Sequence, residues 1–172
     1  MPPTQTVSVS LTPSLIATVS GTNIDPGAIV GFGGSIRHPL NAAPIVFGPG
    51  TGAKQVTQFW SDAQAFTGQT TFNLTNLMIQ SFGNTNNFTG TGVKIILVVH
   101  QGSAGPLTLF GAPSNPWNAG LTGTTPKWVL NPGESFLQYS LVAGGWPVTA
   151  TAQNLLIDAG SNSINALVAL FG

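Results

Sequence analysis

Hydrophobic residues along this chain recur mainly in short runs that alternate with small polar residues and end at glycine, proline or asparagine. Near the start, Val7, Val9 and Leu11 alternate with serine and threonine, and this period of two predicts a half-exposed strand. Pro13 then marks an edge or a break, because proline cannot donate to a strand ladder. The dominant pattern is therefore that of a β protein.

The next region, residues 23–52, is rich in glycine and proline. This composition predicts a long loop that carries brief strands near residues 28–32 and 45–47. Its stretch "GPGTGAK" resembles a phosphate-binding loop, but an alanine separates glycine from lysine and no serine or threonine follows. We therefore reject a nucleotide site there.

Two segments carry helical spacing. Val56, Phe59, Ala63 and Phe66 could lie on one helix face, but the threonine and phenylalanine content and the break at Gly68 favour two strands. In the second segment, leucine, methionine and phenylalanine recur at helical spacing before a glycine that can end a helix. That pattern predicts one short helix near residues 74–82.

The second half of the chain is a series of strand-like runs. Residues 93–100, "VKIILVVH", form a nearly continuous β-branched run, which is typical of a strand buried on both faces. Residues 105–112 predict another strand, and "KWVLNPGESFLQYSLV" predicts two strands around an Asn-Pro-Gly turn. The last 29 residues predict three strands in a meander, "WPVTAT", "NLLIDA" and "INALVALF", with a turn at residues 160–162. The apolar last strand should lie in the middle of a sheet, where both of its faces are covered.

Together these runs amount to roughly nine or ten strands, so we predict an all-β sandwich or jelly-roll-like fold with one short helix. The length of 172 residues suits a single domain. We expect one β domain over residues 1–172, with a loop-rich N-terminal part, 1–52, and a main sheet region, 53–172.

The charge content changes the functional picture. Four Lys or Arg and four Asp or Glu residues make up 5% of the chain, against about 25% in an ordinary domain. Hydrophobic residues make up 42% of the chain, which excludes disorder as the reason. A neutral polar surface is readily buried against another subunit, because few ions must be desolvated. We therefore expect a homo-oligomer, and the four cations, Arg37, Lys54, Lys94 and Lys127, are too few for a nucleic-acid binder.

The sequence offers no cysteine chemistry and no recognisable targeting or membrane-spanning segment. The chain has no cysteine, so it has neither disulfides nor thiolate chemistry. The first residues lack a basic stretch followed by a long apolar run, and no window reaches about 18 uninterrupted apolar residues. We therefore expect no signal peptide and no membrane partner.

Candidate catalytic groups are few. His38 and His100 have no acid within a dozen residues, which disfavours a metal site. A Ser-His-Asp site would need one of these histidines with Asp25, Asp62 or Asp158, and no nucleophile-elbow motif supports it. We therefore predict a protein that is not an enzyme and that binds no metal or cofactor.

The acids mostly have structural explanations. Asp25 opens a turn, Glu134 follows Pro-Gly, and Asp158 adjoins the turn at residues 160–162. Asp62 has no such explanation, and the four acids lie far apart in the sequence. A pair of carboxylates for glycoside hydrolysis is therefore disfavoured.

The aromatic residues offer one candidate contact site. Trp117 lies between proline and asparagine in a predicted loop, with Asn115 and Asn118 beside it. An exposed ring next to amides can stack on a sugar or anchor a protein partner. Trp128 and Trp146 lie in strand-like contexts, where a place in the core is favoured.

The order of motifs from residue 74 onward resembles a group of small tailed-phage and uncultured-virus proteins. The shared features stand in "NLTNLMIQSFG", "FTGTGVKIILVVH", "GPLTLFGAPSNPW", "VLNPGESFLQYS", "GGWPVTATAQNLLIDAG" and "NALVALFG". The likeness covers residues 74–172 and rests on spacing and turn residues. Glu134 stands where the group has a second glycine, and Asn154 where an Asp is common. The group has no evident active site, so neither difference removes a chemical role.

This resemblance implies a virion structural protein that sits on or in the capsid. Since we expect no signal peptide, the protein would be made in the host cytoplasm. We expect its partners to be other capsid proteins and copies of itself, as a trimer or pentamer, because closed symmetry would protect strand edges from aggregation. Shell, spike and decoration roles all remain open. The alternative is a carbohydrate-binding, lectin-like module of a viral fibre or surface protein, which would use Trp117 and its neighbouring asparagines.

Overall fold

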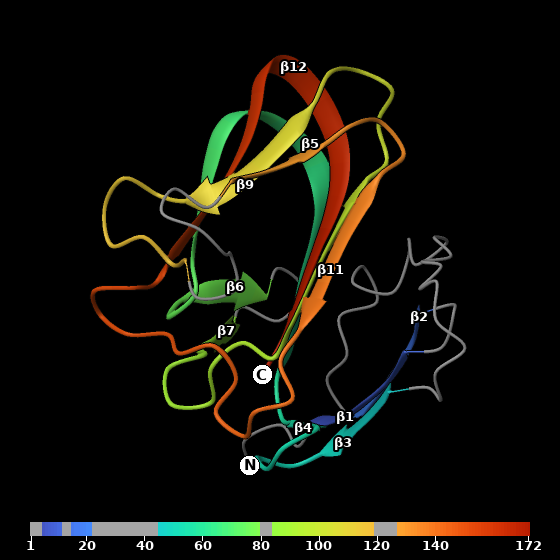
Figure 1. Cartoon of the computed structure of the whole chain (residues 1–172), viewed down its shortest axis with the longest axis vertical. Coiled ribbons are helices and arrows are strands. Elements are labelled where there is room, and N and C mark those ends of the chain that lie inside the picture. Colours follow the sequence, from blue (N-terminus) through green and yellow to red (C-terminus); the bar gives the residue numbers. More distant parts are fainter. Residues whose placement is uncertain (1–4, 12–14, 22–44, 80–83, 119–126) are drawn as a thin grey trace.

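The computed structural model describes residues 5–11, 15–21, 45–79, 84–118 and 127–172. Within these ranges the chain forms β-strands and turns, with no helix, so the prediction of an all-β fold is confirmed (Figure 1). The strands gather into a small N-terminal sheet, a large curled sheet and a two-stranded ribbon.

The N-terminal sheet has the strand order β2-β1-β3-β4. Its members are β1 (Gln5–Leu11), β2 (Leu15–Gly21), β3 (Ile45–Pro49) and β4 (Gln55–Val56). β1 and β2 pair antiparallel, and β3 joins the other edge of β1. The alternating run at the start of the chain and the brief strand near residues 45–47 are therefore confirmed, whereas residues 28–32 lie outside the described ranges.

The large sheet has the order β10-β9-β12-β8-β11, with β5 paired to β12 as well. These strands are β5 (Phe59–Asn73), β8 (Ile95–His100), β9 (Leu107–Gly111), β10 (Lys127–Leu130), β11 (Ser135–Tyr139) and β12 (Asn154–Phe171). The strands expected at residues 93–100, at 105–112 and on both sides of the Asn-Pro-Gly turn are present. The last two do not pair with each other: β10 pairs with β9, and β11 pairs with β8.

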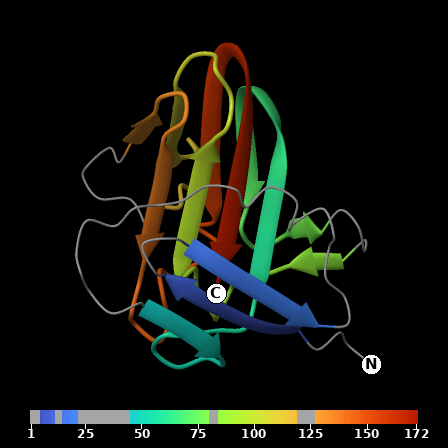
Figure 2. The same ribbon diagram turned by 90° about the vertical axis from the view of Figure 1, so that its right-hand side faces the viewer.

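The long strand β12 explains the curl of this sheet. Its beginning, Leu155–Asp158, pairs with β9, and its end, Ala166–Phe171, pairs with β8, while β5 follows it on the opposite edge (Figures 1 and 2). One pair of strands thus continues through both layers, with β9 and β10 in one layer and β8 and β11 in the other. The result is a sandwich-like arrangement.

Two expected chain breaks are irregularities inside long strands. The β5–β12 register shifts between Asp158 and Ser163, opposite Gly68, which has a φ of 62°. The prediction of two strands around Gly68 and of a terminal three-stranded meander is therefore wrong. Both patterns mark a β-bulge or similar irregularity in the pairing, where the two strands curve over from one layer into the other without being interrupted (Figure 1). The expected strand "WPVTAT" is also absent: Trp146 and Thr149 make only isolated bridges.

The short helix predicted near residues 74–82 is not confirmed. Leu74 is followed by a turn, and the next residues form the ribbon of β6 (Leu77–Ile79) and β7 (Asn84–Asn86), while residues 80–83 lie outside the described ranges. The Asn73 side chain accepts the Thr75 N–H at 3.0 Å, a local bond that favours a turn over a helix. Leu74 and Leu77 are buried, so the apolar spacing reflects core contacts of a turn and a strand.

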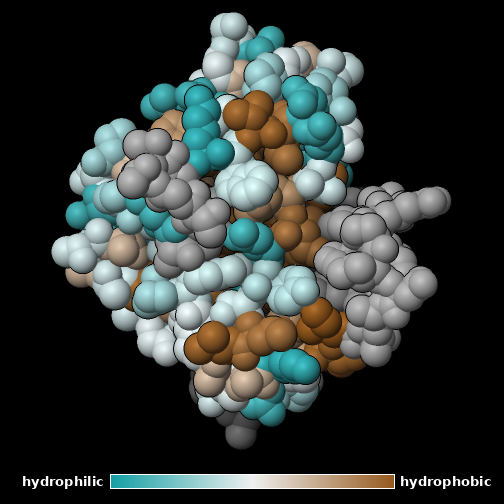
Figure 3. Space-filling view, in the orientation of Figure 1, coloured by the Kyte–Doolittle hydropathy of each residue, from teal (hydrophilic) through white to brown (hydrophobic). Residues whose placement is uncertain are grey.

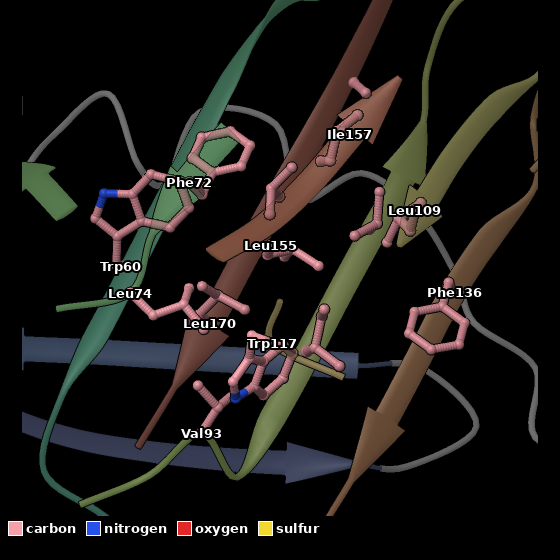
Figure 4. Packing of buried hydrophobic residues seen from close by; sticks show 14 of the residues in the cluster. Trp60, Phe72, Leu74, Val93, Leu109, Trp117, Phe136, Leu155, Ile157 and Leu170 are labelled. Atoms are coloured by element: carbon pink, nitrogen blue, oxygen red, sulfur yellow. The ribbon is translucent and has the colours of Figure 1, made fainter. Parts of the chain in front are cut away.

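The core lies between the two layers of the curled sheet (Figure 4). Its side chains come alternately from the inward face of each strand, among them Phe66, Ile96, Val98, Leu109, Leu155, Ile157, Val168 and Leu170. Trp60, Phe66 and Phe72 from β5 add edge-to-face ring contacts, with centroids 5.1 and 6.0 Å apart. This alternation is what period-two strands produce when only one face meets the core.

A second apolar cluster covers the outer face of the layer that holds β8. Phe47 and Val56 of the N-terminal sheet pack with Phe59, Ile95, Leu97, Ala169 and Phe171. In Figure 2 the small sheet crosses the lower ends of the main strands on this side. β8 and the end of β12 are therefore buried on both faces, as their uninterrupted apolar sequences predict.

The last residue is held within this arrangement. The Gly172 carbonyl oxygen accepts the N–H groups of Thr57 and Gln58 at 2.6 and 2.7 Å, and the Gly172 N–H donates to the Gln58 carbonyl at 3.0 Å. A side chain at position 172 would meet the Gly92 carbonyl and the Phe88 ring. The apolar terminal strand is thus an interior element of the sheet, as predicted.

Candidate functional site

The tryptophan expected to make surface contacts lies in the core. Trp117 has no exposed surface, and its Nε1–H donates to the Pro147 carbonyl at 3.1 Å. Its ring lies among core side chains (Figure 4), and it meets the Trp146 ring edge-to-face with centroids 6.3 Å apart. The expectation of an exposed ring at Trp117 is therefore wrong. A single hydrogen bond to a loop carbonyl satisfies the indole, so a ring in a loop sequence can be buried without cost.

The two asparagines beside it remain exposed but have structural roles. Asn115 has a left-handed φ of 49°, and its carbonyl accepts the N–H groups of Gln153 and Asn154 at 3.0 Å each. Asn118 lies against Gly111, where a Cβ would meet its Oδ1 at 2.1 Å. Asparagine tolerates the left-handed region, which explains its choice at the turn. The three predicted contact residues thus lie on one loop, but they present no aromatic ring on which a sugar could stack.

The exposed tryptophan is instead Trp128, on the edge strand β10. The ring is 39% exposed, and the neighbouring Val129 is 48% exposed. Trp128 contacts Phe136 of β11 with centroids 4.9 Å apart, so it lies across the open side of the sandwich between the two layers. Trp128 was expected in the core, but its side chain is only partly buried. Trp146 packs against the core as expected.

One edge of β10 is free within the described residues. In the described part of the chain it pairs with β9 on one side and with no strand on the other. Val129 lies opposite Thr108, on the outer face of the layer, and Lys127 is the only charged residue of the strand. Edge strands usually carry charges, prolines or bulges that prevent pairing with another chain. β10 has one lysine and is otherwise apolar.

Further apolar residues reach the surface near the other edge strand. Leu141 and Val142 follow β11 and are 42% and 66% exposed. On the face seen in Figure 3, apolar side chains lie in separate patches among polar and weakly polar residues. Met78 on β6 and Val46 on β3 are also exposed. On this face, polar and weakly polar groups are therefore interrupted by apolar positions.

The acids fix turns and strand pairs. The Glu134 carboxylate accepts the Asn131 N–H at 2.7 Å and its side-chain amide at 3.2 Å, and these bonds lower the pKa of Glu134. The Gly160 N–H, at 2.7 Å, and the Gln69 amide, at 3.0 Å, lower the pKa of Asp158. The predicted local roles of Glu134 and Asp158 are thus present in the structure.

The remaining catalytic candidates do not gather at one place in the described residues. Asp62 of β5 accepts the Gln64 side-chain amide at 2.8 Å. His100 is buried at the end of β8, where Nε2 lies 2.9 Å from the Gly105 carbonyl and Nδ1 has no partner. His38 and Asp25 lie outside the described ranges. Within those ranges, no three His, Asp or Glu residues are arranged to hold a metal ion.

One unusual group was not singled out by the sequence. Lys94, directly before β8, is only 1% exposed, and desolvation lowers its pKa. Its Nζ donates to the carbonyls of Thr51, Gly52 and Gln55, at 3.3, 3.0 and 2.5 Å. The sequence feature that could have drawn attention to Lys94 is its position in residues 93–100, a run that otherwise predicts a strand buried on both faces.

Comparisons with protein-family models, with curated proteins and with solved structures found no match. No helix in the described residues has the length and apolarity to cross a membrane.

Proposed function

We propose that this protein is a non-enzymatic virion structural protein that acts by associating with copies of itself or by docking on a capsid. The observation that carries the proposal is the edge strand β10, which exposes Trp128 and Val129 beside a single charge. The low charge of the whole chain and the resemblance of residues 74–172 to small viral proteins support the same role. Decoration, spike and shell positions are all compatible with it.

The topology fits this role as well. Two long paired strands that continue through both layers of a sandwich are compatible with a jelly-roll-like subunit, and we include that finer description in the proposal. Such subunits present their strand edges and connecting loops laterally, where neighbouring copies can cover them.

The mechanism is passive burial. Exposed apolar positions and a free strand edge would be covered by symmetric contacts in a trimer or pentamer, and closed symmetry would leave no edge open to aggregation. Neutral polar groups around these positions desolvate at lower cost than ions. The role requires no cofactor, metal or nucleic acid, and it places the protein in the virion.

The exposed edge allows a direct test. Val129→Lys adds a second charge to β10 while leaving the contact between Trp128 and Phe136 in place. We expect the wild-type protein to elute as an oligomer in size exclusion with light scattering, and the variant to shift toward the monomer.

A matched control is Thr67→Lys, because Thr67 is exposed on β5 and lies opposite Ser163 of β12, which is also exposed. This variant should keep the wild-type assembly. A wild-type protein that is monomeric at every concentration and that does not attach to particles in electron micrographs would overturn the proposal. An equal loss of assembly in both variants would reject β10 as the contact.

A further inference from the structure

The buried lysine lies at the floor of a small cavity. The cavity has a volume of about 170 Å³ and is lined by Thr51, Thr57, Gly90, Thr91, Lys94, Ala143 and Gly144. Thr51, Gly90, Ala143 and Gly144 are exposed and form its rim, whereas Lys94 is buried. By the liquid volume of water, about 30 Å³ per molecule, the space corresponds to about six water molecules. It can thus hold a ligand of a few heavy atoms, which can enter from solvent.

No described residue that lines the cavity carries a charge opposite to that of Lys94. Among the described residues that line the cavity, Lys94 is the one ionisable residue, and its ammonium group donates to three main-chain carbonyls. Carbonyl oxygens satisfy the three N–H donors but carry no net charge. Burying a cation without a counter-charge is costly, and interactions with a nearby opposite charge are stronger away from bulk water.

The main chain holds the charge in place. The Lys94 N–H donates to the Phe171 carbonyl at 2.6 Å, and the Lys94 carbonyl accepts the Ser140 N–H at 2.7 Å. The carbonyl-bearing loop is itself fixed, since the Gly52 N–H donates to Gln55 Oε1 at 2.8 Å. The cation is therefore preorganised between β12 and the loop before β4.

Hydroxyl groups complete the lining. Thr57 Oγ1 donates to the Gly172 carbonyl at 3.3 Å, and Thr91 Oγ1 donates to the Phe88 carbonyl at 3.4 Å. Both distances are long for an O–H···O bond, so little is lost if these hydroxyls turn toward a better acceptor. Thr51 adds a third hydroxyl at the rim. A ligand with several acceptor oxygens and a negative charge matches these donors and the lysine.

We propose that this cavity binds a small oxyanion, with Lys94 supplying the opposite charge and the threonine hydroxyls supplying hydrogen bonds. The site is separate from the β10 edge, so it does not depend on the proposed virion role. It also differs from a phosphate loop, in which backbone N–H groups bind the anion. Here the segment "GPGTGAK" directs carbonyl oxygens toward Lys94, and the threonine hydroxyls would bind the anion.

Inorganic phosphate and acetate are the two probes. The melting temperature of the full-length protein is measured as each anion replaces chloride at constant ionic strength and pH 7. We expect the melting temperature to rise with anion concentration, as for any ligand that binds the folded state alone. ³¹P line broadening in the presence of protein should report phosphate binding independently. A response to both anions would assign the site to small oxyanions in general, and a response to phosphate alone would assign it to tetrahedral oxyanions.

The variants separate the site from non-specific salt effects. Lys94→Met should abolish both signals, and Thr91→Val, which keeps the side-chain shape, should weaken apparent affinity about tenfold, the change expected for one lost hydrogen bond. Thr89→Val is the matched control, because Thr89 is exposed and does not line the cavity. Lys127→Met is the control for loss of a surface charge.

The proposal fails if neither anion changes the melting temperature or the ³¹P line of the wild-type protein. It also fails if Thr91→Val and Thr89→Val respond identically to phosphate. Since the second comparison uses two variants that conserve shape, it remains informative if Lys94→Met does not fold.

Discussion

The end of β12 and the strand β10 belong to the same curled sheet but meet opposite environments. Ala166–Phe171 lies between β5 and β8, with the core on one face and the N-terminal sheet on the other. Among the described strands, β10 has one neighbour, and three of its four residues are exposed. Both sequences are apolar and almost free of charge. The difference teaches that the fold covers one apolar strand by itself and leaves the other exposed in the described residues, where we propose that a partner covers it.

The largest expected effect is on the covered side. Phe171→Ala removes a fully buried ring that contacts Phe59 at a centroid distance of 4.7 Å. The variant should lose about 3–5 kcal/mol of unfolding free energy, the usual cost of deleting a buried aromatic side chain. Urea denaturation measures it. A loss below about 1 kcal/mol would mean that the end of β12 is not interior.

The second effect concerns close packing beside that strand. Gly92 and Gly133 both have positive φ, 67° and 81°, but only at Gly92 would a Cβ strike other atoms, the Gly144 carbonyl oxygen at 2.1 Å first. Gly133→Ala should cost about 1–2 kcal/mol for the backbone alone. Gly92→Ala should cost about 1–3 kcal/mol more, because the neighbouring chain must move. Equal losses in thermal or urea unfolding would contradict the close approach of residues 92 and 144.

The third effect is a dependence of stability on pH. Burial lowers the pKa of Lys94 below 10.5, so the unfolded state binds more protons between that lowered value and 10.5. The unfolding free energy should therefore rise with pH across this window, by at most about 1.4 kcal/mol per pH unit for one group. Lys94→Met should remove the rise. An unchanged slope in the variant would show that Lys94 titrates alike in both states.

The smallest effect is expected at the open edge. Val129→Lys changes an exposed residue, so the unfolding free energy of the dilute protein should change by less than about 0.5 kcal/mol. The same variant should alter assembly strongly. A large loss of monomer stability would mean that Val129 is part of the fold rather than of a contact surface.

Period-two alternation and uninterrupted apolar runs predicted the class and most strands, because burial acts directly on residue type. They placed β1, β8 and the end of β12 correctly, including the two-sided burial of the last two. The bulge opposite Gly68 was interpreted as a turn, because left-handed glycines serve both structures and only the distant register between β5 and β12 separates them. The segment near residues 74–82 was interpreted as a helix, because a buried turn followed by a strand, as found at residues 74–79, can reproduce helical spacing.

The site was less accessible to sequence reasoning. Trp117 and Trp128 lie in loop-like and strand-like sequences, yet the first is buried and the second half-exposed, since exposure depends on which element covers each one. Lys94 became notable only when the loop at residues 51–55 was placed around it. Those long-range contacts leave no local pattern.

Hydrogen exchange, followed by mass spectrometry at low and high protein concentration, tests the central claim most directly. The amides of Ala166–Phe171 should be protected at both concentrations, because this protection arises within one chain. The amides of β10 should exchange readily in dilute solution and become protected at high concentration, when copies cover the edge. Identical exchange of β10 at both concentrations, together with an unchanged molar mass, would contradict the account.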